Sequence, residues 1–119
     1  MYVDGFVLPV PEKNLKAYRA IAQKAGKIWR EHGAVQYVEA VGDDLNNKWG
    51  VKFNKLIKAK PGETVFFSFI VYKSRADRDK VNAKVMADPR MQKIMKKGEP
   101  MPFELKRMAY GGFKYLVNL

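Results

Sequence analysis

The sequence contains no cysteine and only one histidine, His32. The lack of cysteine excludes disulfides, thiol nucleophiles and thiolate metal sites, and a single histidine excludes a metal site built from several imidazoles. No apolar run approaches the roughly 18 residues that a membrane-spanning helix needs. The first residues also lack the charged and apolar regions of a secretory signal. We therefore expect a cytoplasmic protein with no metal, no cofactor and no membrane partner.

Apolar and basic residues are both abundant. Hydrophobic residues make up 47% of the 119 positions, which is enough to build the core of one domain spanning residues 1–119. Basic residues outnumber acidic ones by 23 to 12, and the formal net charge is +11. This charge permits nucleic acid, anionic membranes or small anions as partners, although lysines spread along a chain are also typical of a solvated surface.

The stretch Thr64–Tyr72 is rich in aromatic and β-branched residues and follows a Pro61-Gly62 turn, so it predicts a strand. A strand with one face in water alternates apolar and polar residues. This segment is instead apolar at both its odd-numbered and its even-numbered positions. It must therefore be covered on both faces. One parity carries Val65, Phe67, Phe69 and Val71, and the other carries Phe66, Ile70 and Tyr72.

The other elements follow from changes of period along the chain. Apolar residues recur at helical spacing between Glu12 and His32, and a capping box at Ser74–Asp77 marks the start of a second long helix. The expected strands are 2–10, 34–41, 64–72 and 106–117, with a possible arm or edge strand at 51–59; the expected helices are 12–32, 75–86 and 89–98. This order predicts an α+β fold of the ferredoxin-like βαββαβ type, with an antiparallel sheet and helices on one face.

Helices on one face leave the other face of the sheet bare. A monomer would then expose a large apolar patch to water. Pairing two such sheets through a two-fold axis removes the patch, so we expect a homodimer with the architecture of a dimeric α/β barrel.

Several segments are similar to a known family. They include Tyr2–Val7, Trp29–Ala34, Lys58–Thr64, Ile70–Arg75, Val81–Met86 and Lys106–Phe113. On these segments the chain resembles the YbaA-like family of small bacterial proteins, a family catalogued as a domain of unknown function. The likeness spans nearly the whole chain and departs at about Leu45–Leu56.

The resemblance implies a ferredoxin-like subunit in a dimeric α/β barrel and implies no established activity. Some relatives carry a label that links them to the RNA of the signal recognition particle, so an RNA-binding protein that uses its basic surface is the alternative function. The RNA recognition motif, however, needs glycines and a basic residue among the aromatics of its third strand. The segment Glu63–Phe69 has none of them.

Polar residues on the strands are the candidates for a ligand site. On the faces turned away from the helices they would point into the barrel and line a cavity between the sheet and its partner, but strand parity does not establish which face is which. A buried carboxylate among them could act as a general base. The alternative is a structural network or an ion pair, such as Glu39 with Arg75 or Arg107. The candidates for binding are Tyr37, Ser68, Tyr72, Arg75 and Tyr110, and those for proton transfer are Glu39, His32 and Asp4.

Three residues of the first long helix have competing interpretations. His32 is a candidate for proton transfer because it is the one histidine of the chain, but the helix dipole alone also favours a histidine at a helix C-terminus. Tyr18 and Trp29 lie on the apolar stripe and are expected in the core.

The sequence therefore predicts a small organic ligand, and leaves open whether the chain converts it by cofactor-free acid/base or oxygenase-type chemistry or only binds it.

Overall fold

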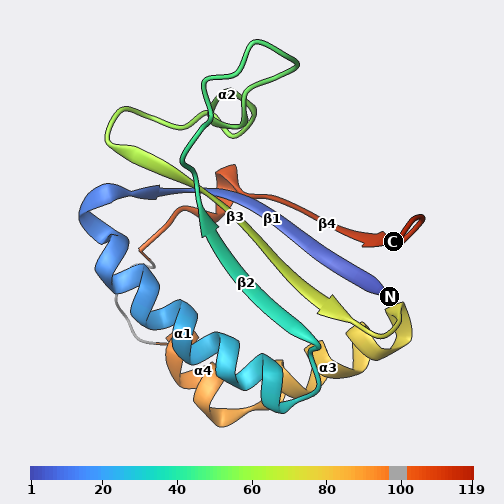
Figure 1. The fold of residues 1–119 in the computed structure, drawn as a ribbon. Helices are drawn as coiled ribbons and strands as arrows, with labels where there is room; N and C mark the ends of the chain where they lie inside the picture. The colour runs from blue at the N-terminus through green and yellow to red at the C-terminus, as the bar shows by residue number, and fades with distance from the viewer. Residues whose placement is uncertain (97–101) are drawn as a thin grey trace.

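The computed structural model describes residues 1–96 and 102–119 as two layers, one of strands and one of helices (Figure 1). The strands are β1 (Tyr2–Pro11), β2 (Gln36–Val41), β3 (Glu63–Tyr72) and β4 (Ala109–Lys114). Their order across the sheet is β2-β3-β1-β4, and every neighbouring pair is antiparallel. The expected α+β class with an antiparallel sheet is confirmed.

Three helices cover one face of this sheet, namely α1 (Leu15–Glu31), α3 (Arg75–Ala87) and α4 (Pro89–Lys96). The short 3-10 turns η1 (Glu12–Asn14) and η2 (Leu105–Arg107) precede α1 and β4. No helix in the described ranges is both long and apolar enough to cross a bilayer. The end of the third expected helix, near residues 97–98, lies outside the described residues.

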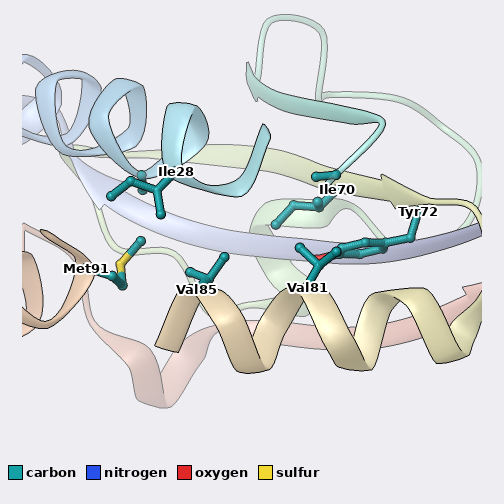
Figure 2. Close-up of a cluster of buried hydrophobic side chains, with 8 residues drawn as sticks. Ile28, Ile70, Tyr72, Val81, Val85 and Met91 are labelled. Atoms are coloured by element: carbon teal, nitrogen blue, oxygen red, sulfur yellow. The ribbon is translucent and has the colours of Figure 1, made fainter. Parts of the chain in front are cut away.

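The main core lies between these helices and the sheet. Figure 2 shows Ile28 of α1 and Met91 of α4 on the same side as Val81 and Val85 of α3, all turned toward the sheet. Ile70 and Tyr72 of β3 complete the cluster, and each buried side chain of this size contributes about 1.5–3 kcal/mol. The even-numbered residues of β3 therefore face the helices.

Two glycines let elements approach closely. A Cβ on Gly26, in the middle of α1, would lie 2.7 Å from the ring of Tyr37, so only glycine lets the helix pass over β2 at this point. Gly112 of β4 likewise faces the ring of Tyr2, which a Cβ at this position would meet at 2.9 Å or less. Gly33 adopts φ +117° and ends α1, a conformation that glycine alone adopts without strain.

The outer face of the sheet carries the odd-numbered residues of β3. At one end it is covered by an arm that contains the short helix α2 (Phe53–Leu56), and Ile57 packs there against Val7 and Val65. Of the two alternatives for 51–59, the arm is confirmed and the edge strand is wrong, because this segment folds over the sheet instead of pairing with it. Elsewhere the outer face is open: Phe67 is 47% exposed and Phe113 is 61% exposed.

A bidentate ion pair joins Arg107 to Glu63 at the start of β3, and it predicts that the stability of the fold falls in acid. Arg107 donates to the two carboxylate oxygens of Glu63 at 2.6 and 2.7 Å, and these bonds lower the pKa of Glu63 to about 2. Since the folded pKa is depressed, this stabilisation is complete above the ordinary value of 4.5 and is lost as the pH falls toward 2. We expect Glu63→Gln to cost about 1–3 kcal/mol at neutral pH. In urea unfolding, this difference from the unaltered chain should shrink on acidification; a difference independent of pH would contradict the assignment.

Candidate functional site

A cavity of about 540 Å³ lies between the helix layer and the sheet. Its floor is formed by the helix-facing residues of the four strands, and its walls come from α1, α3 and α4. Most of the lining is apolar, with Phe6 and Ile70 on the floor and Met91 on the wall. Two polar clusters interrupt this lining, one on β2 and one on β1.

The first cluster centres on Glu39 of β2. Tyr18 of α1 donates to Oε1 at 2.7 Å, Tyr37 donates to Oε2 at 2.8 Å, and the hydroxyl of Ser68 also donates to Oε1. Burial, reinforced by the neighbouring carboxylate, raises the pKa of both tyrosines, so they stay protonated as donors. Three of the roughly four acceptor positions of this carboxylate are therefore occupied. We call these four residues the Glu39 cluster.

The second cluster centres on Asp4 of β1, which is 1% exposed. Arg78 of α3 places Nη1 3.2 Å from Asp4 Oδ1 and 3.2 Å from the hydroxyl of Tyr110, and Nη2 3.4 Å from the hydroxyl of Tyr2. Burial raises the pKa of Asp4, and the guanidinium of Arg78 opposes this rise. Asp4 is thus a carboxyl group with increased proton affinity beside a cation. We call these four residues the Asp4 cluster.

Three side chains connect the layers between the clusters. The indole N–H of Trp29 lies 3.1 Å from the hydroxyl of Tyr72 and 3.2 Å from Oδ1 of Asn82, and the Tyr72 hydroxyl donates to the same oxygen at 3.0 Å. The three residues come from α1, β3 and α3. Because Trp29 can only donate and the Asn82 oxygen accepts twice, the hydrogen bonds fix the side chains at the cavity wall.

The structure brings six predicted site residues into this one cavity: Asp4, Tyr37, Glu39, Ser68, Tyr72 and Tyr110. They face the helices and not the side on which a partner sheet would pack. The sequence had left this orientation open, because β3 is apolar at both its odd-numbered and its even-numbered positions. Whether these residues bind a ligand stays a prediction.

The other two predicted residues do not line the cavity. Nε2 of His32 lies 2.8 Å from Oδ2 of Asp88 at the corner between α1 and α4, where Arg90 also contacts this carboxylate. The hydrogen bond from Arg90, and to a smaller extent the one from His32, lowers the pKa of Asp88. Arg75 is exposed at the start of α3. Of the structural alternatives for Glu39, the ion pair with Arg75 or Arg107 does not form, since Glu39 lies in a network of hydroxyl groups and Arg107 binds Glu63.

The sequence prediction missed Arg78 and Asn82. Both follow the helical spacing of the buried Val81 and Val85, so the inward face of α3 could have been found from the capping serine onward. Ser74 does cap this helix, because its Oγ accepts a bond from Asp77 N at 3.0 Å. Tyr18 lies in the core as expected, and it also contributes its hydroxyl to the Glu39 cluster.

The arrangement defines a class: a two-layer α+β protein with a mostly apolar internal cavity and paired polar clusters. Its fold is similar to that of the protein Atu4242 from Agrobacterium tumefaciens, with a TM-score of 0.58 and 17% identity over 96% of this chain and 92% of that chain. It is also similar to an uncharacterized NIPSNAP domain protein from Burkholderia xenovorans, with a TM-score of 0.56 and 13% identity over 97% and 94%. At these identities the likeness concerns the fold alone.

Sequence comparison gives the family. Residues 1–105 match the model described as a protein of unknown function (DUF1428). The chain is also 44% identical over 117 residues to the uncharacterized protein YbaA of Escherichia coli K12, covering 98% of this chain and 97% of that relative, and the same figures hold for YbaA of Shigella flexneri. The chain belongs to the YbaA-like DUF1428 family, as the resemblance of its segments indicated.

Proposed function

We propose that this chain binds a small organic ligand in the cavity between its sheet and its helices. The observation that carries the proposal is the cavity itself, whose volume of about 540 Å³ lies within the range of ligand pockets. An apolar lining with a few convergent polar groups is the usual composition of such pockets. The cavity lies within one chain, so the proposal does not depend on an assembly.

The two polar clusters indicate the size of the ligand. Asp4 pairs across the sheet with Ile70, and Ile70 pairs with Tyr37, so β1 and β2 flank β3 at this level. Since neighbouring strands are about 4.8 Å apart, the backbones that carry the clusters are about 10 Å apart. A ligand of one or two rings would span this distance above Phe6 and Ile70.

The clusters differ in the chemistry that they offer. The occupied acceptor positions of Glu39 make it an anchor for the hydroxyl donors Tyr18 and Tyr37, not a general base. Asp4 has a raised pKa and is the better candidate to exchange a proton with a ligand. Arg78 does not line the cavity itself and would act on a ligand through Asp4 and Tyr110, which do. Acid/base catalysis would therefore depend on Asp4, and a binding protein would use the same groups without turnover.

A thermal-shift screen of a metabolite library tests this function. Ala25 is 8% exposed and lines the cavity, so Ala25→Leu should fill part of the ligand's space. We expect a stabilising compound to raise the melting temperature of the unaltered chain and of Ala20→Leu, an exposed change on the same helix, but not that of Ala25→Leu. Equal shifts in all three proteins would place the ligand elsewhere. Mass spectrometry of the incubated compound then separates conversion from binding.

We also infer that two copies pair through the outer face of the sheet. The strand order β2-β3-β1-β4 with helices on one face supports a ferredoxin-like subunit, and such a subunit leaves this face uncovered. The rings of Phe53, Phe67 and Phe69 lie in contact at 6.2 and 6.1 Å between centroids and form one apolar surface there. A second copy would bury this surface and give the dimeric α/β barrel.

A further inference from the structure

A second hollow runs between α1 and β2, and it shares Tyr37 and Glu39 with the cavity. This α1–β2 groove has a volume of about 980 Å³, and its floor includes Tyr37, Val41 and Phe66. Strand β2 is at the edge of the sheet, and Figure 1 shows α1 running alongside it. The groove therefore combines a helix flank with an open strand edge.

The open edge of β2 presents unused backbone groups. Gly42 N donates to Val65 O at 2.7 Å, and the register continues with Ala40 opposite Phe67. Hydrogen-bonded pairs alternate along an antiparallel ladder, so the even-numbered residues of β2 bond to β3. The N–H and C=O groups of Tyr37, Glu39 and Val41 consequently point away from β3, toward the open side. An edge of this kind accepts an added strand.

The helix that borders the groove is basic. Lys16, Arg19, Lys27 and Arg30 line it at helical spacing, and α1 carries no acidic residue between Leu15 and Arg30. The two acids that also line the groove are already engaged: Glu39 binds three hydroxyl groups, and Glu31 binds Arg90 at 2.6 Å. In contrast, α3 alternates basic residues with Asp77 and Asp79. Along this flank of α1, the positive charge is thus not offset by a free acidic side chain among the residues that line the groove.

We propose that the α1–β2 groove of the single chain binds an extended acidic segment of a partner protein, which adds a strand to the sheet at β2 and therefore competes with closure of this edge in a dimeric barrel. The outward backbone groups would bond to its main chain, and acidic side chains at alternate positions would meet the basic flank of α1. A second copy of this chain fits poorly, because pairing β2 with β2 would bring two basic helices together. The six residues of β2 span about 20 Å, so a segment of six to eight residues is long enough.

Fluorescence anisotropy with the labelled peptide Glu-Val-Glu-Val-Glu-Val-Glu-Val tests the charge requirement. We expect Arg19→Glu with Lys27→Glu to weaken binding by at least about tenfold. Lys80→Glu with Lys84→Glu, exposed positions on α3, changes the net charge equally and should have little effect. Equal loss in both variants, or no binding at millimolar peptide, overturns the proposal.

A second measurement tests the added strand. Val41→Pro removes a single outward N–H and should weaken peptide binding while leaving the circular dichroism spectrum unchanged. Where this variant fails to fold, a peptide N-methylated at alternate residues serves on the unaltered protein, and one of the two methylation registers should lose binding. If neither register matters, or if a uridine octanucleotide of similar charge binds more tightly through Arg19 and Lys27, the groove does not bind an added strand.

Discussion

Replacing Phe67 with glutamate is expected to leave single folded chains at concentrations where the unaltered protein sediments as a dimer. Phe67 is 47% exposed in the isolated chain and lies on the outer face beside the arm, between the rings of Phe53 and Phe69. In a face-to-face dimer the new carboxylate would be buried without a partner, at a cost of several kcal/mol. A cost of about 4 kcal/mol weakens the dimer roughly a thousandfold.

Sedimentation velocity at micromolar concentration measures this effect. Ala83→Glu introduces the same charge at an exposed position of α3 and should leave the dimer intact. If the unaltered protein is already a single chain at this concentration, the dimer proposal is wrong. The cavity proposal survives that result, because the cavity is enclosed by elements of one chain.

Removing one member of the Asp4–Arg78 pair should have the largest effect on stability. Asp4→Ala leaves Arg78, whose side chain is only 14% exposed, without its buried counter-charge. Breaking a buried pair in this way typically costs about 3–5 kcal/mol, a large share of the stability of a domain of this size. The double change Asp4→Leu with Arg78→Met replaces the pair by apolar side chains and should recover most of the loss.

Urea unfolding of the Asp4→Ala variant and of the double variant measures these differences. A cost below about 1 kcal/mol for Asp4→Ala would show that the pair contributes little. The double variant also separates structure from function: it should be stable and yet lose any ligand found in the screen. If it is stable and binds the ligand unchanged, the Asp4 cluster serves only to hold the fold.

The sequence predicted much of the fold because β3 is unusually informative. Its two apolar parities indicated a central strand covered on both faces, and the helical stripe and the serine cap defined α1 and α3. Because both faces of β3 are apolar, the sequence did not show which face of the sheet carries the site. When Phe66 and Phe67 are equally apolar, no local signal tells which of them faces the helices, and only the packing of α1 and α3 decides it.

Contacts between residues far apart in the sequence explain the other differences between the prediction and the structure. The arm around Phe53 has a loosely alternating pattern, yet it forms a short helix because Ile57 finds its partners, Val7 and Val65, on the sheet. Arg78 was missed in favour of Arg75, although its helical spacing from Val81 and Val85 was readable. The chosen arginine was the one nearest the end of β3, whereas the one that reaches Asp4 lies a turn further along α3.

The two tryptophans have opposite surroundings, and this gives the molecule a built-in optical reporter. Trp29 is held by Tyr72 and Asn82 at the cavity wall, whereas Trp49 in the arm is 86% exposed. Iodide should quench the fluorescence of Trp49 first, and the remaining emission should come from Trp29. A compound that binds beside Trp29 would then change the wavelength or the intensity of this remaining emission. Neither the compound nor the protein would need a label.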